Sequence, residues 1–268
     1  MKRKWLTASI FGILAQFFGT PSAFAQLNSF TVLAGTTVTN TGSSVVNGGL
    51  GVSPGSAVTG FPPGTVVSGT IHSADAVAAQ GQVELTTLYN TLAAQPCGVN
   101  LTGQDLGGLT LTPGVYCFNN AAQLTGILTL NGLGNPNATF TFNIASTLTT
   151  ASASSVLLTN GAGSCGVAWR VGSSATLGTG TAFFGNIVAL ASITLNTGAN
   201  VSGRVLARNG AVTLDTNGAN FCSGSASLPG LPPPIQLGAP ALSLTALGGL
   251  ALLLAAMGSV LAVKARAW

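Results

Sequence analysis

Acid–base side chains are scarce in this chain of 268 residues, which holds four Asp and Glu residues and one His. They are Asp75, Glu84, Asp105, Asp215 and His72. Asp75 and Glu84 are nine residues apart in a segment with helical periodicity, which separates them by about 13 Å along a helix axis. Polysaccharide hydrolysis needs two carboxylates within about 5–10 Å of each other. We therefore interpret Asp75 and Glu84 as capping and solvated side chains of a helix, and we expect no catalytic residue and no enzyme.

Four cysteines are the other reactive side chains: Cys97, Cys117, Cys165 and Cys222. No Cys-X-X-Cys pair occurs and the chain has a single His, so we expect no zinc or other metal site. No glycine motif has the spacing of a phosphate or dinucleotide loop, so no cofactor is expected. An even number of cysteines in an exported chain indicates disulfides. Three pairings are possible; sequence proximity favours Cys97–Cys117 with Cys165–Cys222, and free buried thiols are the alternative.

The most regular pattern in the chain is the phrase Thr-Leu-X-Thr, which occurs four times. Its copies begin at Thr147, Thr176, Thr194 and Thr213, and the last three start 18 and then 19 residues apart. A fixed period with one Leu in each copy predicts a β-solenoid, in which every coil stacks the same side chain on the last. Many Gly residues and few aromatic residues fit short strands and tight turns. The fold class expected is mainly β.

One long helix is expected beside the coils, over about residues 73–95. Ser73 is a favourable N-cap, Asp75 suits the positive end of a helix, and Pro96 would end it. Its apolar stripe is Val77, Gly81, Leu85, Leu88 and Leu92. The strand alternation puts Val188, Leu190 and Leu206 on the outside of one side of the coils. We expect the stripe of the helix to cover these three side chains.

Aligned on the repeat, the outward side chains form columns of short, uncharged residues. One column is Thr150, Thr179, Thr197 and Thr216, the second is Ala153, Ala182, Asn200 and Asn220, and a further one is Thr147, Thr176, Thr194 and Thr213. Neighbouring strands lie about 4.7–4.9 Å apart, so each column repeats at that spacing. Threonine is stiff at χ1 and loses little entropy when a surface docks. Such columns suit ordered water, although threonine is also simply favourable in strands.

Both ends of the chain have the composition of targeting segments. Residues 1–25 combine three basic residues, an apolar run and a small-residue cleavage site, which predicts a signal peptide; a membrane anchor is the alternative. Residues 225–240 are rich in Pro and predict a stiff linker. Residues 241–268 hold an uncharged stretch long enough for a transmembrane helix, followed by Lys264 and Arg266. We expect export through a cleaved signal peptide and an extracellular or cell-surface location, with that C-terminal helix as a candidate membrane anchor.

Few charges lie between these ends. Only 4% of the residues are charged, against about a quarter in ordinary soluble domains. The middle holds Arg170, Arg204 and Arg208 against the four acids, a balance of 3 − 4 = −1. Nucleic-acid binding requires clustered Lys and Arg, so no nucleic-acid partner is expected.

Four segments resemble the large microbial ice-binding protein family: Ser29–Gly42, Gly49–Pro62, Gly185–Leu190 and Gly203–Leu214. The resemblance runs from about Leu27 to Cys222 and defines a solenoid domain over about residues 26–224. It implies an irregular right-handed β-helix of triangular section with one long α-helix packed alongside. It also implies that one flat face adsorbs to ice or ordered water rather than to a small-molecule substrate.

Members of that family carry a Thr-Ala/Gly-X-Thr/Asn pattern on the ice-binding face. Residues 197–200 fit this pattern, whereas residues 150–153 and 179–182 depart from it at the last position and residues 216–220 contain one extra residue. The resemblance therefore implies ice-binding positions at Thr150, Ala153, Thr179, Ala182, Thr197, Asn200, Thr216 and Asn220.

Two other functions remain to be weighed against ice binding. A cell-surface structural or adhesive β-solenoid without ice activity is the main alternative. A sugar-binding or polysaccharide-acting β-helix is disfavoured because sugar-binding faces usually need aromatic side chains. Trp169 is the only Trp between the two ends, and strand alternation favours a packing role for it.

The tail also resembles bacterial sorting tails, in which a short Pro motif precedes an apolar helix, at Ala239–Ser243. A sorting tail and a plain anchor both remain open.

Overall fold

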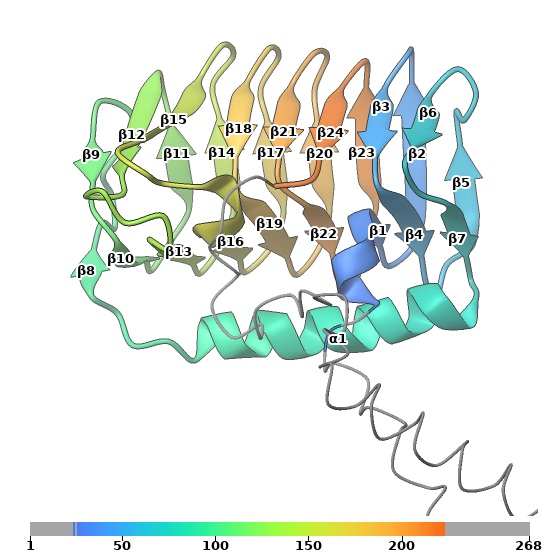
Figure 1. Cartoon of the computed structure of the whole chain (residues 1–268), viewed down its shortest axis with the longest axis horizontal. Helices are drawn as coiled ribbons and strands as arrows, with labels where there is room; N and C mark the ends of the chain where they lie inside the picture. Colours follow the sequence, from blue (N-terminus) through green and yellow to red (C-terminus); the bar gives the residue numbers. More distant parts are fainter. Residues whose placement is uncertain (1–23, 25, 223–268) are drawn as a thin grey trace, which may run out of the picture. The chain divides into compact units, whose positions relative to one another are not determined.

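The computed structural model describes Phe24 and residues 26–222. Short strands follow one another around three parallel sheets, here called sheets A, B and C (Figure 1). Each circuit of the chain around the three sheets forms one coil, and the coils stack on one another through parallel strand pairing, as expected for a β-solenoid. The short helix η1 (Leu27–Ser29) precedes the first strand, and η2 (Ser164–Gly166) lies between β15 (Ser155–Thr159) and β16 (Val167–Val171).

Sheet A runs in the order β7 (Ile71–Ser73), β4 (Gly49–Val52), β1 (Phe30–Ala34), β22 (Val205–Ala207), β19 (Asn186–Ala189), β16 (Val167–Val171), β13 (Phe140–Ile144), β10 (Gly114–Phe118) and β8 (Val99–Asn100). Sheet B runs β11 (Ala122–Leu124), β14 (Leu148–Thr150), β17 (Ala175–Leu177), β20 (Ile193–Leu195), β23 (Val212–Asp215), β2 (Thr37–Thr41) and β5 (Ala57–Thr59). Sheet C runs β6 (Thr65–Val67), β3 (Val45–Asn47), β24 (Gly218–Asn220), β21 (Asn200–Ser202), β18 (Ala182–Phe184), β15 (Ser155–Thr159), β12 (Ile127–Asn131) and β9 (Thr110–Leu111).

The order of the coils in space differs from their order in the sequence. Strands β1, β2 and β3 pair with β22, β23 and β24, so the first described coil stacks on the last one. The helix α1 (Ala76–Ala93) carries the chain from β7 at one end of the solenoid to β8 at the other (Figure 1). Sequence position therefore does not reveal which coils are neighbours.

The helix α1 covers the outer side of sheet A. Leu85, Leu88 and Leu92 of the helix are fully buried with Val188 and Leu206 of the sheet in one apolar cluster. The cover expected for the outward apolar residues of these strands is confirmed, with Val77 and Leu190 at the margin of the cluster. The burial is favourable because every one of these side chains leaves water.

The start of α1 differs from the expectation in one detail. Asp75, rather than Ser73, is the N-cap, and its side chain accepts a hydrogen bond from the N–H of Ala78. Ser73 is the last residue of β7, and its hydroxyl donates to the carbonyl oxygen of Ser56. The helix begins at Ala76 because the carboxylate of Asp75 satisfies a free N–H of its first turn.

Inside the coils, apolar side chains stack from strand to strand. The rings of Phe142 and Trp169 are parallel, with centroids 3.8 Å apart, and Trp169 is fully buried. Its indole N–H donates to the carbonyl oxygen of Phe184, which satisfies the polar atom of the ring. The packing role expected for Trp169 is confirmed.

Both expected disulfides are present. Cys97 pairs with Cys117 and Cys165 pairs with Cys222, with Cα–Cα distances of 5.8 and 4.8 Å. The first bond lies beyond the end of α1 and links that loop to β10. The second fixes the last described residue to η2.

Three predicted segments lie outside the described residues: the signal peptide apart from Phe24, the linker at 225–240 and the tail at 241–268 with its predicted transmembrane helix. Within the part of the chain that the structure describes, no helix is sufficiently long and apolar to cross a membrane.

Candidate functional site

Sheet B carries six threonines in a single column across adjacent strands. Thr149, Thr176, Thr194, Thr213, Thr39 and Thr59 occupy equivalent positions in β14, β17, β20, β23, β2 and β5. We call this set the threonine column. Gln123 of β11 precedes Thr149 at its end. At about 4.8 Å between strands, the five intervals of the column span about 24 Å.

Alternation along each strand makes these threonines point outward. Ile193 and Leu195 are buried in the core on either side of Thr194, and Val212 and Leu214 are buried on either side of Thr213. Side chains next to each other in a strand point to opposite faces, so the two threonines lie on the outer face. Thr39, Thr59, Thr149 and Thr213 are exposed, and Thr176 and Thr194 are partly exposed. The column is therefore a continuous outer surface.

A second column lies where sheet B turns toward sheet C. It contains Ser152, Thr179, Thr197, Asp215 and Thr41, and we call it the corner column. The residue that follows each column member in the sequence donates its N–H to the carbonyl oxygen of the column member in the adjacent coil. These hydrogen bonds run from Ala153 to Thr179, from Gly180 to Thr197, from Gly198 to Asp215 and from Thr216 to Thr41. All members except the half-buried Asp215 are exposed.

The residues that donate these bonds have positive φ angles. Ala153, Gly180, Gly198 and Thr216 have φ of 58°, 68°, 72° and 54°. The left-handed conformation turns the chain from one sheet to the next, and glycine adopts it at the least cost. The same backbone conformation in every coil keeps the corner column in line.

The predicted outward column is only partly correct. Thr179, Thr197 and Thr216 are exposed at the corner, but Thr150 is buried, at 3% exposure. Its hydroxyl bonds to the hydroxyl of Thr181 at 2.8 Å and accepts from the N–H of Gly178 at 2.9 Å. The prediction that Thr150 faces outward is wrong because the two phrases are not in register. Leu148 pairs with Ala175, two residues before the Leu of the next phrase, so Thr149 rather than Thr147 is aligned with Thr176.

Thr216 occupies a different position from Thr179 and Thr197. It is in line with Gly198, because its own N–H continues the corner hydrogen bonds one residue after Asp215. The left-handed residue Gly198 follows Thr194 by four residues, whereas the equivalent left-handed residue, Thr216, follows Thr213 by three. The shorter corner places Asp215 at the position that Thr197 has one coil earlier.

The second predicted column lies on sheet C and is also split. Ala182 and Asn200 are exposed and in register. Ala182 pairs with Ser155 on one side, and Asn200 pairs with Gly218 on the other. Ala153 and Asn220 therefore do not belong to this row of paired residues. Ala153 is an exposed corner residue, and Asn220 pairs with Ser202 farther along the strand.

Sequence reasoning missed Thr39, Thr59 and Thr149 as members of the threonine column. It placed Thr147 in the same column as Thr176, Thr194 and Thr213, whereas Thr149 is the residue in register with Thr176. Thr39 and Thr59 precede the first copy of the phrase, at Thr147, by 108 and 88 residues. The stacking of β2 on β23 and of β5 on β2 brings them into line. The alternation of threonine in residues 37–41 predicts a strand, and it is the sequence signal that could have placed Thr39 on the outer face.

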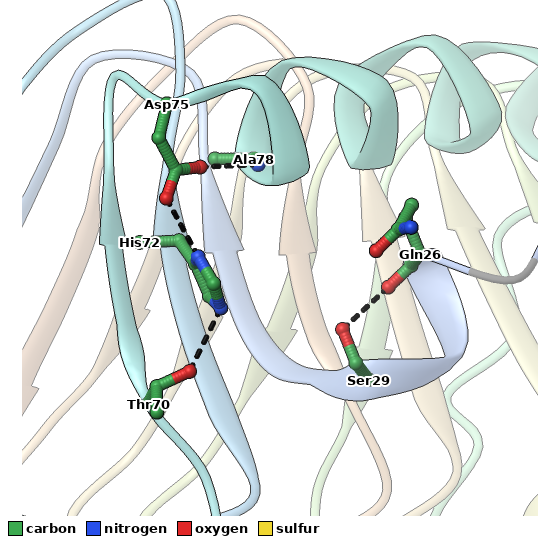
Figure 2. Close-up of polar contacts among 6 residues, drawn as sticks. All are labelled: Gln26, Ser29, Thr70, His72, Asp75 and Ala78. Carbon is green, nitrogen blue, oxygen red and sulfur yellow. Dashed lines mark hydrogen bonds and ion pairs between the residues drawn. The ribbon is translucent and has the colours of Figure 1, made fainter.

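Asp75, outside sheet B, has a structural role at the start of α1 (Figure 2). Asp75 accepts a hydrogen bond at 2.8 Å from the N–H of Ala78 and one at 2.7 Å from Nδ1 of His72. The other ring nitrogen of His72 bonds to the hydroxyl of Thr70 at 2.8 Å. The Ala78 N–H first and His72 second lower the pKa of Asp75. The capping role expected for the carboxylate of Asp75 is thus confirmed, although the N-cap position itself was expected at Ser73.

Glu84 differs from the expectation that it is solvated. It is 5% exposed, and its carboxylate accepts from the N–H of Leu27 at 2.7 Å and from Nε2 of Gln80 at 3.2 Å. Glu84 therefore holds η1 against α1, and the helical pattern of the sequence does not reveal this contact because Leu27 lies 57 residues away in the chain. Among the described residues, no group of three His, Cys, Asp or Glu side chains could hold a metal ion.

Comparison with known proteins identifies relatives of this solenoid. The family model described as Ice-binding-like matches residues 32–220. The "Ice-binding protein" of Nostoc sp. (strain HG1) is 61% identical over 197 residues, which are 73% of this chain and 72% of that protein.

Two solved structures share the fold. An ice-binding protein from an Antarctic biological consortium is similar with a TM-score of 0.72 and 46% identity, over 76% of this chain and 93% of that one. An ice-binding protein from the Antarctic ascomycete Antarctomyces psychrotrophicus has a TM-score of 0.72 and 40% identity, over 76% of this chain and 100% of that one.

Proposed function

The chain belongs to the ice-binding-like family, and we propose that it adsorbs to ice through the outer face of sheet B. The threonine column and the corner column together form the proposed surface, with Ala182 and Asn200 at its margin. The single observation that carries this proposal is the register of six threonines across six adjacent strands.

The chemistry of threonine fits ordered water. Its hydroxyl both donates and accepts hydrogen bonds, as each water molecule in ice does. Its methyl group restricts the orientations of the water molecules around it. The stiff χ1 angle and the strand pairing hold each side chain in place before binding, so adsorption costs little conformational entropy.

Many weak contacts of this kind would fix the protein to a growing ice surface. Ice then advances only between adsorbed molecules, and its front becomes curved, which opposes further growth. The outcome would be inhibition of ice growth or recrystallisation, or attachment of a cell to ice. No step in this mechanism requires a catalytic group, a cofactor or a metal ion.

We further propose that the protein acts outside the cytoplasm. The composition of residues 1–25 supports export, and two disulfides suit an oxidising compartment. The apolar stretch in residues 241–268 supports attachment to the cell surface, either as an anchor or as a sorting tail.

An ice-recrystallisation assay and an ice-affinity assay on the full chain test the proposed function. The chain should restrain recrystallisation and become enriched in growing ice, and Thr194→Tyr in the centre of the threonine column should remove both effects. Thr87→Tyr is the matched control, because Thr87 is exposed on α1. The proposal fails if the unmodified chain has no effect on ice, or if Thr194→Tyr and Thr87→Tyr behave alike with the fold intact.

A further inference from the structure

Asp215 is the only charged residue among the described strands of sheet B. It lies in the corner column, between Thr197 on one side and Thr41 on the other. It also follows Thr213 by two residues in the same strand, so both side chains point to the same face, about 7 Å apart along the strand. A carboxylate thus stands where the neighbouring coils have a threonine.

The carboxylate of Asp215 engages two hydroxyls, that of Thr197 in the adjacent coil and that of the next residue in the chain, Thr216. One oxygen accepts a hydrogen bond from the hydroxyl of Thr197 at 2.5 Å, and the other accepts from the hydroxyl of Thr216 at 3.1 Å. No Lys, Arg or His among the described residues forms an ion pair with Asp215. Its negative charge is therefore balanced by hydroxyls and by solvent alone.

This arrangement is unfavourable for contact with ice in two ways. A carboxylate accepts hydrogen bonds but donates none, whereas a threonine hydroxyl does both. In addition, the protons of Thr197 and Thr216 are committed to Asp215 and cannot be donated to a water molecule of the lattice. Removing water from a charged group also costs more than removing it from a hydroxyl.

We propose that Asp215 limits how tightly sheet B binds ice, so that it sets the strength of adsorption rather than supporting it. This inference rests on the proposed function and extends it to one residue. Replacement by asparagine keeps the size and an acceptor oxygen and removes the charge. Replacement by threonine would complete the corner column with the residue that the adjacent coils have.

The test compares Asp215→Asn and Asp215→Thr with the unmodified full chain in the recrystallisation assay and in thermal hysteresis measurements. Each variant should act at a concentration lower by about two- to ten-fold, the range that one net hydrogen bond supplies. Asp75→Asn is the charge control: it removes the same charge at the start of α1, on the side of sheet A, and should leave ice activity unchanged. Circular dichroism at the assay temperature establishes that all variants are folded.

Two results would overturn the inference. If Asp215→Asn binds ice as the unmodified chain does, the charge has no influence. If it binds more weakly with the fold intact, the carboxylate positions Thr197 and Thr216 for ice instead of limiting them. Failure of the proposed function looks different, because the unmodified chain and Thr194→Tyr would then be equally inactive.

Discussion

Thr194 of β20 and Thr213 of β23 lie directly opposite each other in adjacent parallel strands, and both side chains point outward from sheet B. The pairing is repeated by four further threonines in the same sheet. Parallel neighbours at about 4.8 Å hold their hydroxyl and methyl groups at nearly constant spacing.

Thr213→Val distinguishes the contribution of the methyl group to ice binding from that of the hydroxyl. Valine keeps the branched shape and the strand preference of threonine, so the fold should be unaffected. Ice activity should fall only in part, because the methyl groups remain, whereas Thr213→Tyr should abolish it by lifting the surface away from ice. Thermal hysteresis of the two variants measures the difference. Equal activity of Thr213→Val and Thr213→Tyr would show that shape is not the deciding property.

Thr150→Val should reduce stability and leave ice activity unchanged. The substitution leaves the buried N–H of Gly178 without its acceptor, which costs about 1–3 kcal/mol in the free energy of unfolding. Urea denaturation measures this loss. Thr179→Val is the matched control on the surface: it should weaken ice binding and change the free energy of unfolding little, since Thr179 is exposed. A loss of ice binding in folded Thr150→Val would contradict the assignment of Thr150 to the interior.

The helix and its place could be predicted because local patterns determine them. The stripe that includes Leu85, Leu88 and Leu92 has helical spacing, and the outward Val188 and Leu206 required cover. These signals arise within short segments, so no knowledge of the coil order was needed. The core role of Trp169 followed from strand alternation in the same way.

The composition of the surface could not be predicted fully, because it depends on the register between coils. Thr150 was assigned to the wrong face because the first two copies of the phrase were aligned directly. These copies are 29 residues apart, so the coil between them is longer than the later coils, and its extra residues shift the register. Thr39 was missed because the repeated phrase is continued in space by the stacking of its coil on the last coil, which lies far from it in the sequence. The position of Asp215 depends on a corner that is one residue shorter than the corner of the preceding coil. The Thr-Leu-X-Thr phrase is the same in both coils and does not indicate this difference.

The two disulfides should stabilise the solenoid unequally. Cys165–Cys222 closes a separation of 57 residues and Cys97–Cys117 one of 20. In the chain-entropy description, their removal costs about 4 and about 3 kcal/mol respectively. Replacing each pair by serine and measuring the free energy of unfolding should show the larger loss for Cys165–Cys222. A larger loss for Cys97–Cys117 would mean that contacts around the bond outweigh loop closure.

Stability should decrease in acid through Asp75 and Asp105. Hydrogen bonds from the Ala78 N–H and then from His72 lower the pKa of Asp75 below 3.8 (Figure 2). Desolvation raises the pKa of Asp105, but the N–H groups of Gly107 and Thr125 outweigh it and lower the pKa overall. A carboxyl whose pKa is lower in the folded chain stabilises the fold above 3.8 and loses that contribution as the pH falls through its folded pKa.

Thermal denaturation between pH 5 and about pH 2 checks this pH dependence. The melting temperature should be steady near pH 5 and should fall below pH 3.8. Asp75→Asn should melt lower than the unmodified chain at pH 5, and the difference should become smaller in acid. An unchanged difference across this range would show that ionisation of Asp75 does not support the helix.

Gln123→Thr should extend the threonine column by one strand. Gln123 is exposed and in register with Thr149, and on its other side it pairs with Asp105 through an isolated bridge, so Gln123 is the position directly next to the end of the threonine column. Threonine in its place would add one more hydroxyl and methyl at the same spacing, so ice activity should rise modestly, with less effect than Asp215→Thr. Thermal hysteresis of the single and double variants measures both increments. Residue 123 is distant from Asp215 by several coils, so the two gains should add; if Gln123→Thr weakens activity instead, the binding surface ends before β11.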